Sequence, residues 1–462
     1  MTNQDVISAL KAELGGIVLS GSDIPVRNEG DWTSQSGTRP LAVVRPETTG
    51  SVAAVLRICS KYYVSVVPQG GLTGLAGGAQ PTSDCVVISL ERLVGIDEID
   101  RSAHTMTVRA GTTLEAVQRA AEDAGLYFAV DLGARGSCTI GGNIATNAGG
   151  NRVIRYGMMR ESVLGIEAVL PDGSVLSSLN KMIKNNAGYD LKQLFIGSEG
   201  TLGVVTRAVL KLMPLPLSTS TAVCGVKDYE AVLRLLDNAR QNLGSSLSAF
   251  ELMWPDFFDL ATAEVPGIRR PIQGDHDFYV LVEAQGANPN TDQEAFETWL
   301  GGALEAGIVE DAVVAQSLSE AQAFWNVRDA GSEFKAIIGS SVSFDIGLPV
   351  GAIGEYVQRC RSVLASELPG CISFYFGHIA DGNIHVMACI PSASEQPVDC
   401  IDEIVYRLVK EYSGTVSAEH GIGIRKRAYL PLTRNDDEIA LMKVLKKALD
   451  PRNILNPGKV FC

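Results

Sequence analysis

The chain has 462 residues, of which 46% are hydrophobic and 20% are charged, and its formal net charge is −14. A chain of this length exceeds what one hydrophobic core supports, so we expect two or three globular domains. The negative charge repels polyphosphate, and the absence of a basic patch excludes a nucleic-acid partner. No stretch approaches the roughly twenty apolar residues of a membrane span.

The nine cysteines are scattered and form no Cys-x-x-Cys pair. Their odd number is typical of reduced thiols in a reducing compartment, which argues against both iron–sulfur and disulfide chemistry. The N-terminal residues lack the basic region and apolar run of a signal sequence. We therefore expect a cytoplasmic protein.

Residues 1–39 are expected to form a lead-in segment. Val6 and Leu10, with Leu14, recur at helical spacing and predict a short helix over residues 4–14. A helical pattern after Pro46 then leads to a buried strand over residues 64–67, which runs directly into a glycine-rich loop. A strand followed by a glycine loop is typical of a ligand-binding layout.

Two local signals indicate that strands and helices continue to alternate. Thr112 with Glu115 predicts a capping box for a helix that reaches Ala121, with Gly125 as its left-handed cap. Residues 171–174 predict a hairpin turn between two apolar strands. We therefore expect a mixed sheet rather than a purely parallel one.

The composition changes around Pro214-Leu-Pro216, where we place a domain boundary. The first domain is then expected over residues 40–216, and a second domain of helices and antiparallel strands over residues 217–412. Residues 413–462 form a separate C-terminal segment. Its helix over residues 439–449 is followed by a proline-punctuated end that is expected to pack back on the first domain.

Glycine is concentrated in the loop from Pro68 to Gly78. Bare backbone amides there could approach an anion closely, and a pyrophosphate is the ligand that we expect. The loop matches neither the nucleotide P-loop nor the G-x-G-x-x-G pattern. Taken alone, its glycines could equally serve only to make tight turns.

Two further glycine-rich phrases favour a ligand over simple turns. The first runs from Asp131 to Gly150, and the second covers residues 184–205 with a Gly-Ser-Glu-Gly centre at Glu199. Three such loops can enclose a long, bent ligand that carries phosphates and rings.

The five histidines are unevenly distributed, and three lie in two short C-terminal phrases. Asp381-Gly382 predicts a hairpin turn that brings His378 and His385 close together at one end of the hairpin. With Glu419, which lies beside His420, they make an ordinary ligand set for a divalent transition metal. Each histidine alone could merely cap a turn, but their clustering favours a metal site.

Three phrases of the chain resemble one known family, the FAD-dependent 2-hydroxy acid dehydrogenases. They are Gly197-Ser-Glu-Gly-Thr-Leu-Gly203, Ser417-Ala-Glu-His-Gly421 and Leu449-Asp-Pro-Arg-Asn-Ile-Leu-Asn-Pro457, and the resemblance runs from about Pro40 to the end. Within this family the motifs are nearest to the D-2-hydroxyglutarate dehydrogenases, with the D-lactate dehydrogenases as neighbours.

The resemblance implies an α+β fold, with an FAD-binding domain of the vanillyl-alcohol-oxidase/PCMH type followed by an α+β substrate (cap) domain. It also implies the FAD-binding residues. The pyrophosphate set is Gly70, Gly71, Leu72, Thr73 and Gly74. The residues expected to line the flavin and adenosine portions are Ser137, Gly141, Gly142, Asn143, Thr146, Glu199, Gly200, Gly203 and Val205. Five further residues are expected to contact FAD: Pro68, Gly78, Leu132, Gly149 and Asn456. Covalent relatives often carry a histidine where Leu72 stands, so we expect non-covalent FAD.

Oxidation of a 2-hydroxy acid requires a base for the hydroxyl proton and a flavin for the hydride. Imidazole suits a base near neutral pH, and His420 is expected to fill this role. Its neighbour Glu419 would be the metal ligand, because adjacent extended side chains point apart and would not share one ion. Zinc suits the ligands His378, His385 and Glu419, while manganese, cobalt or iron fit the same ligand types.

The resemblance also implies substrate-binding residues. Arg328 matches a carboxylate-binding arginine, although a surface ion pair is its alternative interpretation. Ser332, one helical turn later, and Asn383 would assist, together with His420. Ser343 stands where the hydroxyglutarate enzymes carry a lysine, so D-malate and D-lactate stay open as substrates.

The resemblance implies that the remaining partner is an electron acceptor, such as an electron-transfer flavoprotein or a quinone-linked carrier, and a homodimer is typical of the family. An oxidase that passes electrons to oxygen is the neighbouring alternative. A catalytically silent flavin- or metal-binding subunit and a metal hydrolase without flavin are the alternatives of other classes.

Overall fold

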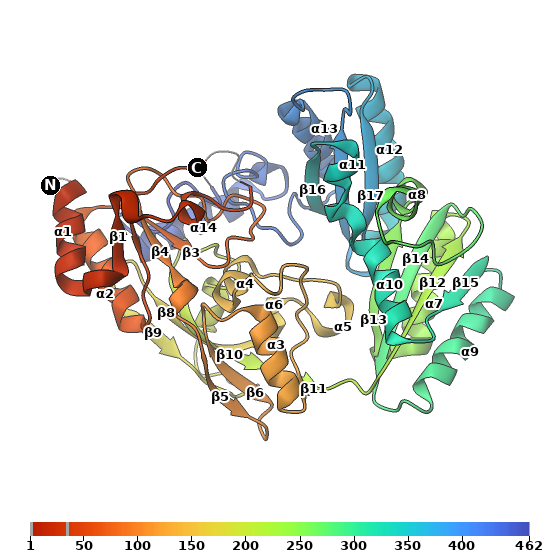
Figure 1. Cartoon of the computed structure of the whole chain (residues 1–462), viewed down its shortest axis with the longest axis horizontal. Coiled ribbons are helices and arrows are strands. Elements are labelled where there is room, and N and C mark those ends of the chain that lie inside the picture. Colours follow the sequence, from red (N-terminus) through yellow and green to blue (C-terminus); the bar gives the residue numbers. More distant parts are fainter. Residues whose placement is uncertain (1–2, 34–36, 462) are drawn as a thin grey trace. The chain divides into compact units, whose positions relative to one another are not determined.

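The computed structural model describes residues 3–33 and 37–461, which divide into two units (Figure 1). The first unit is made of Met1–Gly150, Gly157–Leu215 and Glu419–Cys462, and the second of Asn151–Tyr156 and Pro216–Ala418. Parts of the expected lead-in segment, residues 1–2 and 34–36, lie outside the described residues.

The first sheet of the first unit has four strands in the order β1-β2-β4-β3. Strands β2, β4 and β3 run parallel, while β1 is antiparallel to β2. Helices α1 (Asn3–Leu14) and α2 (Thr49–Tyr62) pack on this sheet, and Val6, Leu10, Val55 and Leu56 are fully buried there. The strands are β1 (Val18–Ser20), β2 (Ala42–Val44), β3 (Val66–Gln69) and β4 (Val86–Ser89).

A second sheet of this unit is antiparallel throughout, in the order β5-β6-β10-β8-β9. The hairpin expected at residues 171–174 is present as β8–β9 in this antiparallel sheet, whereas the mixed sheet of the unit is the four-stranded one. The strands are β5 (Ile96–Asp100), β6 (Thr105–Arg109), β8 (Val163–Val169), β9 (Val175–Ser178) and β10 (Val204–Lys211), and β7 (Leu126–Tyr127) pairs separately with β11 (Met213–Pro214).

Helix α3 (Leu114–Asp123) shows where the sequence-based cap was wrong by one residue. Its N-cap is Thr113, whose side chain accepts a hydrogen bond from the N–H of Ala116. The hydroxyl of Thr112 instead bonds to the backbone of Gly95. Two adjacent threonines offer the same capping chemistry, and the bond to Gly95 decides between them. The remaining helices are α4 (Ile140–Thr146), α6 (Met159–Ser162) and α14 (Asp436–Leu449).

The C-terminal segment packs back on the first unit, as expected. It lies along β3, the edge strand of the four-stranded sheet: the N–H of Val66 donates to Ile454 at 2.6 Å, and the N–H of Asn456 donates to Val66 at 2.7 Å. The buried ammonium of Lys446 donates to Asp450 at 2.5 Å and to the carbonyls of Thr201 and Leu455. These bonds satisfy backbone groups that an open sheet edge would leave unpaired.

The second unit is built on one seven-stranded antiparallel sheet, in the order β15-β12-β14-β13-β17-β18-β16. Its central strands are nearly continuous apolar runs, because helices cover both faces. In chain order the strands are β12 (Ser218–Val226), β13 (Leu247–Met253), β14 (Phe278–Gly286), β15 (Asp311–Val314), β16 (Val342–Gly347), β17 (Ile372–His378) and β18 (Asn383–Cys389).

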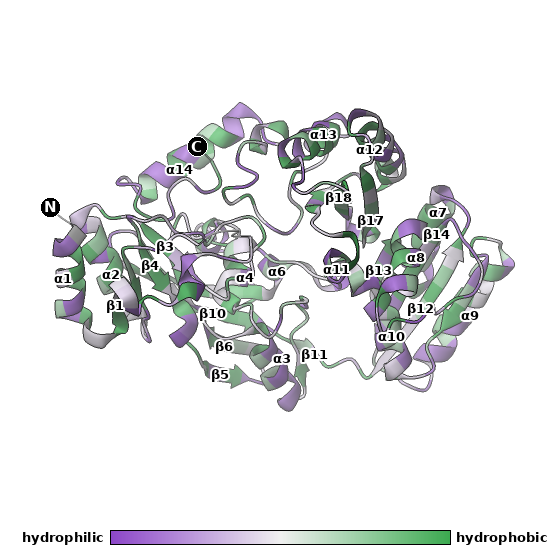
Figure 2. Cartoon of the chain, turned by 45° about the horizontal axis from the view of Figure 1, so that its top comes forward, coloured by the Kyte–Doolittle hydropathy of each residue, from purple (hydrophilic) through white to green (hydrophobic). Residues whose placement is uncertain are grey.

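Contacts divide the long helices between the two faces of this sheet. Helices α8 and α10 cover the face that carries Met253 and Phe376, while α7, α9, α12 and α13 cover the other. Figure 2 shows hydrophilic and hydrophobic residues mixed along α9 and along α14 of the first unit, as expected of half-exposed helices. The helices of the second unit are α5 (Val153–Tyr156), α7 (Tyr229–Leu243), α8 (Pro255–Glu264), α9 (Asp292–Glu305), α10 (Leu318–Arg328), α11 (Phe334–Ile338), α12 (Ile353–Glu367) and α13 (Val398–Glu411).

Within the described residues, none of these helices combines the length and the apolar character that crossing a membrane requires.

Candidate active site

The two histidines of the first C-terminal phrase lie on one hairpin. His378 is the last residue of β17, and His385 is the third residue of β18. The connection is a 3-10 turn over Ile379–Asp381 followed by Gly382, whose φ of 82° lies in the left-handed region. It is therefore longer than the two-residue Asp-Gly turn expected from the sequence, but it has the same effect of folding the strands together.

Strand register places four ionisable side chains on one face of the sheet, as two neighbouring cross-strand pairs that together form the histidine row. Glu251 of β13 is the cross-strand partner of His378, and Asp345 of β16 is the cross-strand partner of His385. Directly opposed residues point to the same face of a sheet. The two imidazole rings are 5.3 Å apart between centroids and nearly perpendicular at 79°.

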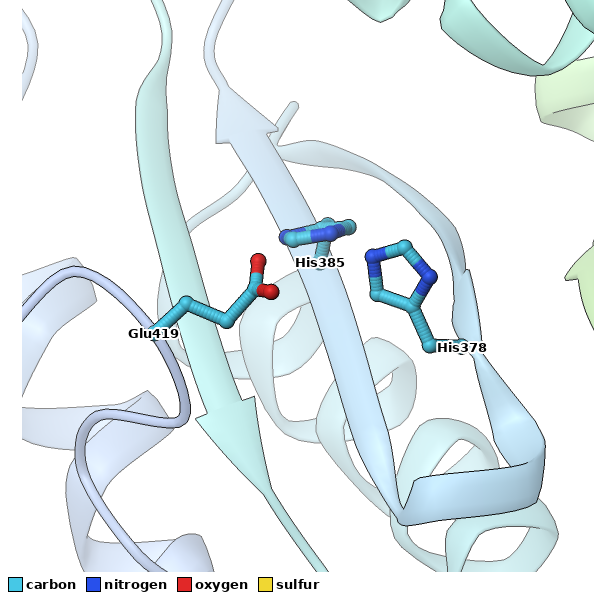
Figure 3. A group of neighbouring side chains, drawn as sticks. All are labelled: His378, His385 and Glu419. Atoms are coloured by element: carbon cyan, nitrogen blue, oxygen red, sulfur yellow. The ribbon is translucent and has the colours of Figure 1, made fainter. Parts of the chain in front are cut away.

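The expected metal ligands come together. One ligand atom from each of His378, His385 and Glu419 lies within 4.8 Å of the others (Figure 3). Glu419 directly follows Ala418, the last residue of the second unit. Its Oε1 also accepts a hydrogen bond from the N–H of Gly150 at 2.6 Å. Two imidazoles and one carboxylate fit a divalent transition metal with an open position.

Arg328 is buried, with 7% of its surface exposed, so the alternative of a surface ion pair does not apply. Its Nε donates to Glu251 Oε2 at 2.7 Å, and its Nη2 lies 2.8 Å from Nε2 of His378. Burial would raise the pKa of the Glu251 carboxyl, but His378 and Arg328 together hold that pKa below its usual range. Glu251 is therefore an anion that contacts Arg328 with one carboxylate oxygen and His378 with the other.

Asn383 lies on the same sheet face and keeps one polar atom without a partner. Its Nδ2 donates to Asp345 Oδ1 at 2.8 Å and to the carbonyl of Ile346 at 3.0 Å. Its Oδ1 is buried and accepts no hydrogen bond within the described residues. Such an atom is costly unless a ligand satisfies it, so Asn383 is a suitable substrate contact.

Ser332 is placed differently from the expectation of a continuous helix. Helix α10 ends at Arg328, and Ser332 is the exposed end of the following 3-10 turn, where its hydroxyl donates to the carbonyl of Asp329.

His420 lies in a half-buried loop that Glu199 anchors. The carboxylate of Glu199 accepts the N–H of Ile422 at 2.7 Å and that of Gly423 at 2.8 Å. Burial raises the pKa of Glu199, while these two hydrogen bonds oppose the rise. Glu199 itself sits at a φ of 52°, a left-handed conformation that is uncommon for a residue with a side chain.

The first two glycine loops of the first unit pack against each other. A Cβ on Gly70 would lie 2.5 Å from the hydroxyl of Thr139, and one on Gly71 would lie 2.0 Å from the carbonyl of Ser137. Gly74, in contrast, has open space where its side chain would be. Only glycine permits this close approach of two backbones beside an open position, and such an arrangement fits a phosphate-bearing cofactor.

The third glycine phrase and the C-terminal segment reach the same region of the first unit. The amide of Asn456 donates to the carbonyls of Gly78 and Glu199, and its buried Oδ1 has no partner among the described residues. A Cβ on Gly200 would lie 3.2 Å from Pro68. The N–H of Glu199 bonds to Ala145 of α4, the helix that holds Gly141, Gly142, Asn143 and Thr146. Part of the expected FAD set thus lies near the end of β3, namely Pro68, Gly70, Gly71, Gly78, Glu199, Gly200 and Asn456.

Two residues of the row were missed by sequence reasoning. Glu251 and Asp345 are lone carboxylates in otherwise apolar strands, Leu247–Met253 and Val342–Gly347. A charge at a position that strand periodicity buries was the available signal, because burying an unpaired carboxylate is expensive.

Comparison with known families identifies a flavin-dependent oxidoreductase. Residues 40–178 match the FAD binding domain family, and residues 215–460 match the C-terminal domain of FAD linked oxidases. The chain thus binds FAD.

Relatives make the assignment more specific. The chain is 38% identical to mitochondrial D-2-hydroxyglutarate dehydrogenase of Arabidopsis thaliana, over 93% of this chain and 77% of the relative. It is 39% identical to D-2-hydroxyglutarate dehydrogenase of Xanthomonas citri, over 93% and 91%. A Schizosaccharomyces pombe relative named for mitochondrial D-lactate dehydrogenase is 37% identical, over 93% and 83%. The chain belongs to the FAD-dependent D-2-hydroxyglutarate dehydrogenase family.

The fold agrees with that of a substrate-bound p-cresol methylhydroxylase, with a TM-score of 0.80 over 99% of this chain and 96% of the other at 16% identity. The predicted PCMH-type FAD-binding fold is therefore confirmed. The predicted cytoplasmic location is wrong on these comparisons, because the Arabidopsis and fission-yeast relatives are named as mitochondrial proteins.

Proposed function

We propose that the protein oxidises a D-2-hydroxy acid to the 2-oxo acid, with D-2-hydroxyglutarate and 2-oxoglutarate as the first pair to test. The observation that carries the proposal is the convergence of His378, His385 and Glu419 within 4.8 Å, in a chain of this family. A ligand set of this kind can bind the hydroxyl and carboxylate oxygens of such a substrate.

When bound, FAD supplies the acceptor for the hydride on C2, and the cation supplies the charge that makes the hydroxyl more acidic. His420 takes the hydroxyl proton as general base. Arg328 offers its guanidinium donors to the substrate carboxylate, and Asn383 offers its buried Oδ1 to a substrate donor. Ser332, the fourth expected substrate residue, contributes its exposed hydroxyl.

The proposed FAD contacts are the residues expected from the sequence, all of which belong to the first unit. The close packing of Gly70 and Gly71 and the unpartnered Oδ1 of Asn456 support this assignment. FAD is non-covalent in the proposal, because Leu72 offers no nucleophile for attachment to the flavin. In this proposal residues 40–216 bind FAD, residues 217–412 bind the substrate, and residues 413–462 provide the base.

The proposed metal is zinc, which suits two imidazoles and a carboxylate, and manganese, cobalt or iron would fit the same ligand types. The electron acceptor is proposed to be an electron-transfer flavoprotein or a quinone-linked carrier, and the assembly a homodimer.

A second substrate class is favoured by Ser343. It is exposed on β16, two residues before Asp345, and therefore shares the sheet face of His385. A neutral residue there provides no cation for a distal carboxylate, which favours D-lactate or another acid without one. The same site in an oxidase would return electrons to oxygen.

The test compares turnover of metal-replete, flavin-loaded protein with D-2-hydroxyglutarate, D-malate and D-lactate, using an artificial electron acceptor. Activity with a D-2-hydroxy acid that is lost on chelation and restored by Zn²⁺ supports the proposal. Peroxide formation in air would instead favour the oxidase.

A further inference from the structure

Glu251 has no place in the scheme above, although it is one of the two buried carboxylates of the histidine row. It is 1% exposed, and its two oxygens face different partners: Oε1 is 2.7 Å from Nδ1 of His378, and Oε2 accepts from Arg328 Nε at 2.7 Å. All three residues belong to the second unit. The register of β13 against β17 places Glu251 opposite His378, and Arg328 is the last residue of α10.

These contacts specify which nitrogen of His378 carries the proton. A carboxylate oxygen at 2.7 Å is an acceptor, so Nδ1 must donate to Glu251. Arg328 only donates, and its Nη2 is closer to Nε2, at 2.8 Å, than to Nδ1, at 3.3 Å. Glu251 therefore fixes a hydrogen on Nδ1, and the Arg328 donor favours a lone pair rather than a hydrogen on Nε2.

A metal ligand needs that lone pair, so a cation bound to Nε2 would take the place of the Arg328 Nη2 donor. Figure 3 shows the ring of His378 directed toward His385 and Glu419 with one nitrogen, while its other nitrogen faces away from them. A carboxylate that bonds to the second nitrogen of a ligating histidine fixes the ring and makes the ligand more basic.

We propose that Glu251 is a positioning residue, which holds His378 in its Nδ1–H form and directs Nε2 to a divalent cation. This inference rests on the proposed metal site. Glu251 touches neither the cation nor the substrate in this scheme and acts only through His378.

The chain provides a matched control in Glu283. It is also buried on the same sheet face, 2% exposed, and bonds to Arg152, Trp325 and Ser248, but to no histidine. Glu283→Gln therefore removes a comparable buried charge without touching the histidine row.

The experiment measures Zn²⁺ affinity of the full-length, flavin-loaded protein by competition with a chromogenic chelator. Glu251→Gln is expected to weaken Zn²⁺ binding about 10- to 100-fold, and Glu283→Gln to leave it unchanged. The visible spectrum of Co²⁺-loaded protein should shift in Glu251→Gln and match the wild type in Glu283→Gln. Equal Zn²⁺ affinity in wild type and Glu251→Gln, or equal losses in both variants, would overturn the inference.

A measurement on the unmodified protein covers the case in which Glu251→Gln does not fold. Only five histidines are present, so selective ¹⁵N-histidine labelling resolves their ring nitrogens, with His378 assigned by its absence in His378→Asn. The expected result is hydrogen on Nδ1 in metal-free protein, and hydrogen on Nε2 would overturn the inference. Wild-type protein that binds no divalent cation would contradict the proposed metal site instead, so the two failures are distinguishable.

Discussion

The carboxylate of Glu199 accepts a hydrogen bond from the backbone N–H of Gly423 at 2.8 Å, although the two residues are 224 positions apart in the sequence. Its other oxygen accepts a hydrogen bond from the N–H of Ile422, so one buried side chain fixes the loop that follows His420. This loop carries the proposed base, and the bonds explain how an irregular segment can present a side chain in a defined position.

Glu199→Gln should therefore reduce both stability and turnover. One of the two N–H donors would face an amide NH₂, and a buried unpaired donor costs about 1–3 kcal/mol. Misplacement of the His420 loop should lower kcat by about 10- to 100-fold. Urea denaturation and steady-state kinetics check both. The exposed Glu122→Gln serves as control, and wild-type kcat in Glu199→Gln would contradict the anchoring role.

His420→Ala should abolish turnover while FAD stays bound, because it removes the proposed base and none of the proposed FAD contacts. The expected loss in kcat is at least about 100-fold, the lower range for general-base catalysis. His104→Asn is the matched control, since asparagine tolerates the left-handed φ of 52° at that position. Unchanged rates in His420→Ala would exclude it as the base.

FAD should be released when the protein is precipitated with acid, because no covalent bond at Leu72 is available. The expected outcome is a yellow supernatant above a colourless pellet, read by absorbance near 450 nm. A yellow pellet would show covalent attachment and would contradict the non-covalent assignment.

Lys446→Met should destabilise the first unit, because it leaves Asp450 buried without its ion-pair partner and releases the carbonyls of Thr201 and Leu455. Breaking a buried ion pair costs about 3–5 kcal/mol. The exposed Lys447→Met on the same helix should stay within about 0.5 kcal/mol of the wild type. Equal urea midpoints for the two variants would mean that the ion pair does not hold the C-terminal segment.

The sequence predicted the histidine hairpin well, because its signals are local. Asp381-Gly382 lies between two apolar runs, and folding them together necessarily brings His378 near His385. The convergence of Glu419 was expected only from residue chemistry, and the return of the C-terminal segment to the first domain only from its proline-punctuated end.

The register of distant strands could not be predicted. Glu251 and His378 are 127 residues apart, and their pairing depends on how β13 lies against β17. Similarly, the choice of Thr113 over Thr112 as helix cap depends on the bond between Thr112 and Gly95. In both cases tertiary contacts decide between options that local chemistry leaves equal.

In the proposed reaction, a D-2-hydroxy acid transfers a hydride to FAD at a metal-dependent site. The most direct measurement is the flavin absorbance of Zn²⁺-loaded protein mixed anaerobically with D-2-hydroxyglutarate. The account predicts bleaching near 450 nm, with none after chelation and none with the L-enantiomer. If neither D-2-hydroxyglutarate nor D-malate nor D-lactate bleaches the flavin of metal-loaded protein, the account is contradicted.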